Sequence, residues 1–199
     1  MLLHSHPLSG NCHKVRLLLG FLGLPYDERM LDVAAGEHKG PAFIAINPNG
    51  TIPVLDDGGV VIRDSQAILV YLARKAKATD WLPTDAEGCA RVTQWLSYAA
   101  NEIHHGPARA RLYAKFGLPG DPAPVVAEAN RILGVLDNRL ARDGWLECGR
   151  ITIADLACVP YVALAPEGGI DLAPYAEVRA WIHRITAMPG FTAMPGFGA

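Results

Sequence analysis

The sequence predicts an α/β N-terminal domain followed by an all-α C-terminal domain. Short β-like runs alternate with helical patterns in the first part of the chain, which places the first domain at residues 1–76. Beyond residue 85 the strand signals stop and apolar residues recur at spacings of three and four, so residues 86–199 form the second domain. The order strand, helix, strand, helix, hairpin, helix implies an α/β layer with a small mixed sheet.

The first half of the N-terminal domain predicts a strand, a helix and a second strand. "MLLH" is a short apolar start, and residues 11–22 carry apolar side chains densely enough for a largely buried helix. The run Gly23-Leu24-Pro25 ends that helix, because glycine and proline interrupt helical backbone. "YDERML" then predicts a strand, and "GEHKGPAFIAI" predicts an irregular turn with a short helix.

The second half of this domain predicts a β-hairpin and a helix. In "IPVLDDGGVVI", Asp57-Gly58 supplies the turn residues between two apolar runs. From Ser65 the pattern "SQAILVYLARKA" is helical, with one apolar stripe and with Asp64 and Ser65 at its N-terminus.

The all-α domain follows a polar linker at residues 77–85, which Pro83 interrupts. Thr152 stands three residues before Asp155 and predicts a capping box at the start of one helix. The tail "AMPGFTAMPGFGA" repeats a Pro-Gly pentad and predicts an irregular segment packed over the helical domain. Three further helices are predicted by their apolar spacing: Val92, Trp95, Leu96, Ala99 and Ile103; Val125, Ala129, Ile132, Leu133, Leu136 and Leu140; Val178, Trp181, Ile182 and Ile185.

The composition argues against several functional classes. The formal charge is −2, so no global basic field would hold nucleic acid or an anionic membrane. No apolar run reaches the ~18 residues of a transmembrane helix, and the N-terminus lacks the pattern of a secretion signal. Four cysteines without a CxxC pair predict reduced thiols, and we expect a cytosolic protein.

Three reactive residue types meet in the stretch "HPLSGNCHK", just before and within the first predicted helix. Asn11 is the predicted N-cap, and Ser9 precedes it. Cys12 falls in the first turn, where the helix dipole lowers the pKa of a thiol, but it shares a face with Val15 and Leu19 that leans it toward the core. The histidines nearby lack a compact ligand spacing, so we expect no metal site.

Five motifs, in this order, resemble the cytosolic glutathione transferases of the serine type, and specifically a phi-, theta- or delta-like bacterial member. They are "PLSGNCHKVRLLL", "GLPYDERML", "GEHKGPAFIAINPNGTIPVLDDG", "IRDSQAILVYLA" and "ITIADLACVPYVA", and together they span nearly the whole chain. The resemblance implies a thioredoxin-like N-terminal domain, an all-helical C-terminal domain that contributes the second-substrate site, and a homodimer.

The resemblance also implies which residues hold the peptide of glutathione. The family carries a cis-proline at Pro53, which exposes the backbone of Ile52 to pair with glutathione like an added strand. Asp64 and Ser65 would hold the γ-glutamyl end, because free N–H groups at a helix N-terminus favour a carboxylate. Without the resemblance the same pair predicts only a plain helix cap, and glutamate is more usual than Asp64 in the family.

Three further positions carry weaker implications. His38 and Lys39 fall where some classes place a His-Lys pair near the glycyl carboxylate, although a solvated turn explains them equally. Thr51 stands where relatives often have Gln or Lys, and a threonine donates only one hydrogen bond. The departures at Thr51 and Asp64 keep open a non-catalytic interaction module of the same fold.

Catalysis in this family needs glutathione as a thiolate. A thiol with a pKa near 8.5 is only ~3% ionised at neutral pH, and lowering the pKa by about two units takes ~2.7 kcal/mol. One hydrogen bond to a charged group supplies ~1.5–3 kcal/mol. Ser9 lies in the register of the serine classes and is the expected donor, with Asn11 as the second candidate. Cys12 would instead support thiol–disulfide exchange or dehalogenation with glutathione.

The second substrate would lie between the domains, against the stretch "YAANEIHHGPARARLY". Its basic and aromatic residues suit an electrophile that bears a carboxylate or halide, although a solvated helix end explains them as well. The expected function is conjugation of glutathione, the co-substrate, to an electrophilic and mostly apolar small molecule. The candidate residues for the second substrate are Tyr98, His104, His105, Arg109 and Tyr113.

Overall fold

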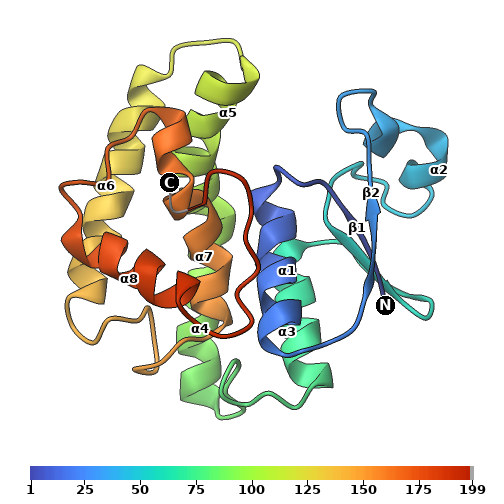
Figure 1. Ribbon diagram of the computed structural model, residues 1–199, viewed down its shortest axis with the longest axis horizontal. Helices are drawn as coiled ribbons and strands as arrows, with labels where there is room; N and C mark the ends of the chain where they lie inside the picture. Colours follow the sequence, from blue (N-terminus) through green and yellow to red (C-terminus); the bar gives the residue numbers. More distant parts are fainter. Residues whose placement is uncertain (198–199) are drawn as a thin grey trace.

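A computed structural model describes residues 1–197 and shows an α/β domain packed against a helical domain (Figure 1). The N-terminal domain has one four-stranded sheet in the order β2-β1-β3-β4. Strand β1 (Leu2–Ser5) is parallel to β2 (Asp27–Met30) and antiparallel to β3 (Val54–Asp57), which pairs antiparallel with β4 (Val60–Ile62). The predicted α/β fold with a small mixed sheet is therefore confirmed.

Helices cover this sheet unequally. The long helices α1 (Gly10–Phe21) and α3 (Ser65–Lys75) lie between the sheet and the helical domain (Figure 1). The short η1 (Glu37–Lys39) and α2 (Pro41–Ile44) lie beyond β2, on the side away from that domain. Because α1 connects the parallel strands β1 and β2, its N-terminus follows directly on the end of β1.

The hairpin differs from its prediction by one residue at the turn. Asp57 is the last residue of β3 and pairs with Val60, so the turn residues are Gly58 and Gly59 rather than Asp57 and Gly58. Both glycines have positive φ, at 63° and 96°. A two-residue turn with positive φ at both positions favours glycine, which explains why the pair Gly-Gly takes it.

The helical domain begins with a nearly continuous helical segment. Helix α4 (Ala86–Tyr98) runs through a π-helical stretch, η2 (Ala99–Ala108), into α5 (Arg109–Phe116). Pro107 lies within η2, and the wider π-type turn accommodates a residue that cannot donate a backbone hydrogen bond. The remaining elements are α6 (Ala123–Leu140), α7 (Ile153–Ala163), η3 (Ala165–Gly168) and α8 (Ala176–Thr186).

Helix α7 lies at the centre of the molecule. It packs against α4 and η2 within its own domain and against α1 and α3 of the N-terminal domain. Ten of its residues are buried, and one apolar core continues from Leu18 and Leu72 through Leu156 and Val159 to Trp181. The two domains therefore share a core, so the position of the helical domain relative to α1 is fixed by packing.

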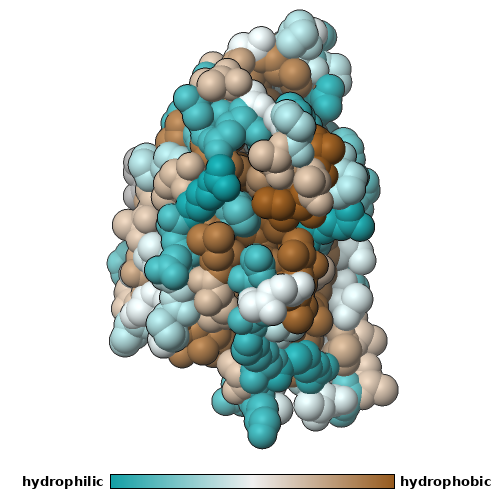
Figure 2. Space-filling view, turned by 90° about the vertical axis from the view of Figure 1, so that its right-hand side faces the viewer, coloured by the Kyte–Doolittle hydropathy of each residue, from teal (hydrophilic) through white to brown (hydrophobic). Residues whose placement is uncertain are grey.

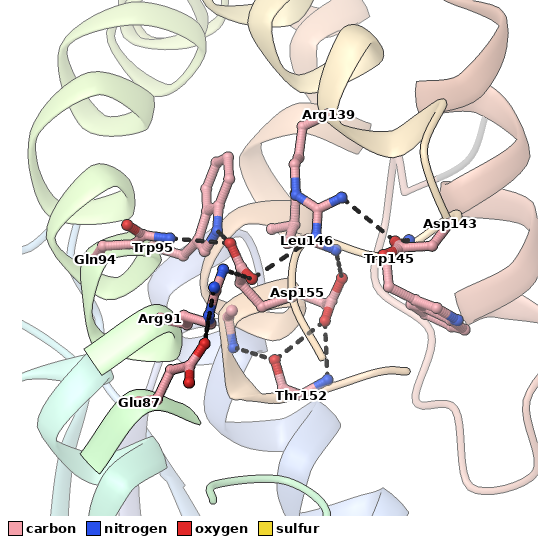
Figure 3. Close-up of polar contacts among 12 residues, drawn as sticks. Glu87, Arg91, Gln94, Trp95, Arg139, Asp143, Trp145, Leu146, Thr152 and Asp155 are labelled. Atoms are coloured by element: carbon pink, nitrogen blue, oxygen red, sulfur yellow. Dashed lines mark hydrogen bonds and ion pairs between the residues drawn. The ribbon is translucent and has the colours of Figure 1, made fainter. Parts of the chain in front are cut away.

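Asp155 of α7 joins three segments through a buried hydrogen-bond network, and Figure 3 shows its contacts with Leu146 and Thr152. Its Oδ2 accepts from the Thr152 backbone N–H at 2.8 Å, and Oδ1 accepts from the Leu146 N–H at 3.1 Å and from Trp181 Nε1 at 2.9 Å. The Thr152 hydroxyl accepts from the Ala154 N–H, so the predicted capping box is confirmed. Burial raises the pKa of Asp155 to about 6, against the lowering effect of these donors.

The tail with the repeated pentads reaches further than predicted. Phe191 and Phe197, one from each pentad, pack edge-on against His13 of α1, with ring centroids 6.3 and 5.1 Å away. A Cβ at Gly20 would lie 2.5 Å from the Gly190 carbonyl oxygen, so the tail also crosses the C-terminal part of α1 closely. The tail thus covers α1 as well as the helical domain (Figure 1). Residues 198–199 of the predicted tail lie outside the described residues.

Candidate functional site

A pocket of about 220 Å³ opens between the two domains. Four segments meet there: the first turn of α1, the loop before β3, the N-terminus of α3 and the π-helical stretch η2. Six of the predicted glutathione residues and catalytic candidates, together with one second-substrate candidate, share this pocket. The lining residues are Asn11, Thr51, Ile52, Pro53, Arg63, Asp64, Ser65, Gln66, Ala99, Ala100 and His104.

The loop before β3 presents free backbone to this pocket. The Ile52–Pro53 bond is cis, as expected from the resemblance, and β3 begins only at Val54. The buried Asn47 holds the loop, because its Nδ2 donates to the Thr51 carbonyl at 2.8 Å and to the Thr51 hydroxyl at 3.1 Å. An extended peptide that lies along Ile52 could therefore pair with a strand-like backbone edge, whose position is fixed by the Asn47 hydrogen bonds.

The N-terminus of α3 is capped by Asp64 and faces the same pocket. Asp64 Oδ1 accepts from the Gln66 N–H at 3.0 Å and from the Ala67 N–H at 2.9 Å. The cap that the sequence predicts is thus present. Ser65 is the first helical residue, and the partial positive charge of the helix end lies where a carboxylate would enter.

At the start of α1 the structure corrects the expected cap. Ser9, not Asn11, is the N-cap: its Oγ accepts from the Cys12 N–H at 3.2 Å. The reason lies in the preceding turn, where the Ser9 N–H donates to the His6 carbonyl at 3.1 Å and sets Ser9 in extended geometry. Asn11 is displaced into the first helical turn, and its side chain is left free to line the pocket.

Cys12 points away from the pocket, in agreement with its predicted face. Its side chain is fully buried, as are Val15 and Leu19 on the same side of α1. Burial raises the pKa of the Cys12 thiol, and the hydrogen-bond donors around it only partly offset this effect. The environment therefore favours a neutral thiol that no ligand in the pocket contacts.

The structure separates His38 and Lys39 from the pocket. They lie on η1, where Lys39 Nζ donates to the Asn49 carbonyl at 3.3 Å. Gly50 connects them to the pocket loop: its φ is 56°, and a Cβ there would lie 2.9 Å from the His38 carbonyl oxygen. Both residues thus border the loop that carries Thr51 without lining the pocket itself.

The five predicted second-substrate residues are also divided. Only His104 lines the pocket. His105 bonds through Nδ1 to the Asn101 carbonyl, and Tyr98 packs edge-on against Trp95 with a pKa that burial raises to about 12. Tyr113 borders a separate pocket of about 350 Å³, and Arg109 lies over its ring at 5.7 Å. The sequence placed all five on one stretch, and the structure divides that stretch among α4, η2 and α5, so the five side chains do not meet at one pocket.

Two residues of the helical domain that the sequence did not single out contact the start of α1. Arg111 of α5 is 3% exposed, and its Nη1 donates to the Leu8 carbonyl at 2.8 Å, directly before Ser9. Tyr161 of α7 packs over Gly10, where a Cβ would lie 2.8 Å from its ring. Each of these contacts joins residues more than 100 positions apart in the sequence, so it forms only when the two domains pack together.

Within residues 1–197, no cluster of three or more His, Cys, Asp or Glu side chains is arranged to hold a metal ion. In the same part of the chain, no helix has the length and apolar character needed to cross a membrane.

Comparison with known proteins agrees with the fold. The glutathione S-transferase N-terminal domain family matches residues 8–75, and the glutathione S-transferase C-terminal domain family matches residues 121–189. Glutathione S-transferase theta-1 of Bos taurus is 31% identical over 195 residues, which cover 92% of this chain and 81% of the relative.

Two solved structures are similar over almost the whole chain. A glutathione S-transferase from Pseudomonas fluorescens superposes with a TM-score of 0.91 at 32% identity, covering 98% of both chains. Ure2p from yeast, in complex with glutathione, superposes with a TM-score of 0.84 at 29% identity, covering 96% of this chain and 90% of Ure2p. The chain belongs to the glutathione S-transferase family, and the thioredoxin-like and helical domains expected from its motifs are confirmed.

Proposed function

We propose that this protein is a glutathione S-transferase that conjugates the glutathione thiolate to an electrophilic, mostly apolar small molecule. One observation carries the proposal: a single pocket joins the free backbone beside Pro53, the N-terminus of α3 and the first turn of α1. These three features match the three parts of a tripeptide thiol: its backbone, its γ-glutamyl carboxylate and its sulfur. The related Ure2p has been solved with glutathione bound.

The tripeptide would lie along the N-terminal domain. Its cysteinyl backbone would pair with Ile52, and its γ-glutamyl carboxylate would accept hydrogen bonds at the start of α3, beside Asp64 and Ser65. The glycyl carboxylate would extend along the loop of Thr51 toward His38 and Lys39, where the Lys39 ammonium offers it a positive charge. The sulfur then lies at the N-terminus of α1.

Two side chains can donate a hydrogen bond to that sulfur. Asn11 lines the pocket, and its amide N–H can reach a ligand directly. Ser9 caps α1 as an acceptor, which leaves its hydroxyl proton free to donate. We place Asn11 ahead of Ser9 because Asn11 lines the pocket, whereas Ser9 is not among the lining residues. A lowered thiol pKa makes the glutathione sulfur the nucleophile, and the protein orients it.

The second substrate would enter from the side of the helical domain, against Ala99, Ala100 and His104. Burial lowers the pKa of His104, with smaller contributions from nearby positive charges. His104 is therefore neutral at neutral pH, and this wall of the pocket has little charge. An apolar electrophile fits that surface better than a strongly anionic one.

A homodimer and a cytosolic location are part of the same proposal. The exposed large apolar side chains of the N-terminal domain include Met30 on β2 and Val60 and Val61 on β4. Figure 2 views that domain from the side away from the helical domain and shows apolar residues gathered among polar ones. Such a surface suits association with a second copy. The four free cysteines suit a reducing compartment.

The test is conjugation of glutathione to a generic aryl halide by the wild type and by Asn11→Ala, Ser9→Ala and Cys12→Ala. We expect the wild type to be active, Asn11→Ala to lose the most activity and Cys12→Ala to keep it. No activity and no glutathione binding in the wild type would favour a non-catalytic module. Loss of activity in Cys12→Ala, with a glutathione adduct on Cys12 in the wild type, would favour thiol–disulfide exchange.

A further inference from the structure

Lys14 of α1 is a buried cation that faces an aromatic ring. It is 1% exposed and lies between the two domains, where α1 packs against α7 and α3 (Figure 1). Its ammonium nitrogen Nζ lies over the Tyr161 ring, 5.6 Å from the ring centroid. Burying an ammonium group costs stability unless nearby groups compensate for the lost water, so its presence at this position requires an explanation.

The position of Lys14 relates it to the proposed sulfur site. Lys14 follows Asn11 by three residues, so the two share a face of α1. Side chains on a helix lean toward its N-terminus, so Lys14 extends toward the turn that carries Asn11. Tyr161 packs over Gly10 on one side, and the Lys14 ammonium therefore lies behind the pocket rather than in it.

The charged and titratable groups facing Lys14 come from three neighbouring elements. They are Asp64 at the start of α3, His104 on η2, and Cys158 and Tyr161 on α7. Burial lowers the pKa of Lys14 to about 8, against raising effects from Cys158 and Asp64. Lys14 is thus a cation at neutral pH, and two of these neighbours, Asp64 and His104, line the pocket.

We propose that Lys14 stabilises the bound glutathione thiolate through space, as a fixed positive charge behind Asn11. This inference rests on the proposed function and adds a second source of thiolate stabilisation to the hydrogen bond at the α1 N-terminus. A positive charge near the sulfur favours the ionised thiol, and the thiol proton leaves to solvent. Tyr161 holds the ammonium in place through its ring face.

The test is the pKa of the glutathione thiol in the complex, followed by ultraviolet absorbance of the thiolate across a pH titration. Lys14→Met keeps the length of the side chain and removes its charge, whereas Lys14→Arg keeps the charge. We expect Lys14→Met to raise the thiol pKa by about one unit, a tenfold change in ionisation, and Lys14→Arg to restore most of the shift. Lys77→Met, at an exposed lysine, is the matched control and leaves the pKa unchanged.

Folding is measured in parallel. Lys14→Met removes a buried charge, so its unfolding midpoint is expected to equal or exceed that of the wild type. Conjugation by Lys14→Met falls at neutral pH and recovers at alkaline pH, where glutathione ionises without help. A merely structural role for Lys14 would not produce this pH dependence.

Three results would overturn the inference. The first is an unchanged thiol pKa in Lys14→Met with glutathione binding intact, which leaves the proposed function standing. The second is loss of glutathione binding in Lys14→Met alone, which makes Lys14 a direct contact of the peptide. The third is a wild type that binds no glutathione, which removes the proposed function as well.

Discussion

Substitution of Asp155 by asparagine tests the network that fixes α7, and through it the position of the helical domain. Both carboxylate oxygens accept from buried N–H donors: Thr152 on Oδ2, and Leu146 and Trp181 on Oδ1. An asparagine offers one carbonyl oxygen and one amide group of nearly the same shape. When the asparagine carbonyl oxygen takes the place of Oδ1, it keeps the donors Leu146 and Trp181. The asparagine NH₂ group then takes the place of Oδ2 and cannot accept from the Thr152 N–H.

The expected loss of stability follows from the number of hydrogen bonds that the substitution changes. One buried N–H loses its acceptor, which costs ~1–3 kcal/mol, and the two retained bonds lose their charge-assisted strength. We expect the free energy of unfolding to fall by about 3 kcal/mol, equivalent to a midpoint lowered by about 6–12 °C for a chain of this size. The shared core predicts one cooperative transition for both domains.

Urea unfolding followed by circular dichroism measures this change. Asp143→Asn is the matched control, because Asp143 lies on the neighbouring loop, is exposed, and accepts from Arg139 and the Trp145 N–H with one oxygen. The control is expected to change stability by less than about 1 kcal/mol. A loss in Asp155→Asn no larger than the loss in the control would refute the reasoning.

Three other predictions follow from buried groups. Burial lowers the pKa of His13 to about 3, so between that pH and about 6.5 the folded protein binds fewer protons than the unfolded chain. From pH 7 to pH 5 the free energy of unfolding of the wild type should therefore fall by about 2 kcal/mol more than that of His13→Phe. Parallel urea titrations at the two pH values measure this difference. A disulfide reagent should modify the half-buried Cys89 and Cys148 in the native protein before the buried Cys12 and Cys158, and equal rates for all four would contradict the burial described above. Arg111→Met removes the hydrogen bond to the Leu8 carbonyl and should lower kcat/KM for conjugation by about tenfold to a hundredfold with unchanged circular dichroism, whereas Arg131→Met, at an exposed ion pair, should not.

The fold was largely predictable because it depends on local signals. Apolar periodicity and turn residues predicted the strands β1 to β4, the helices α1 and α3, and the change to helices after residue 85. The capping box of Thr152 and Asp155 was predictable because both partners lie within one turn. The hairpin turn was misplaced by one residue, since Asp-Gly and Gly-Gly are both good turn pairs and only strand register decides between them.

The pocket was predictable where the family motif lies on short, rigid segments. Ile52, Pro53, Asp64 and Ser65 meet in one pocket because the sheet and the α3 N-terminus position them. Which of the second-substrate candidates line this pocket was not predictable, because a π-helical stretch changes the direction of the side chains and the sequence does not reveal it. Ser9 rather than Asn11 is the N-cap of α1 because the Ser9 N–H donates a hydrogen bond to the His6 carbonyl in the preceding turn. No sequence pattern predicts that hydrogen bond.

The contacts of Arg111 and Tyr161 with the start of α1 depend on domain packing. Neither residue belongs to a local motif around the site, and each reaches it from the other domain. The burial of Lys14 was not predictable for a related reason. Its position in the sequence predicts an ordinary helical lysine, and it is buried only because α7 packs over α1.

The central claim is that the pocket between the domains binds glutathione as a thiolate. Calorimetric titration of the wild type with reduced glutathione, repeated in buffers of different ionisation enthalpy, measures both binding and the protons released. The account predicts one glutathione per chain and release of most of one proton at neutral pH, and no release with S-methylglutathione, whose sulfur cannot ionise. Binding without proton release, or no binding at millimolar glutathione, would contradict it.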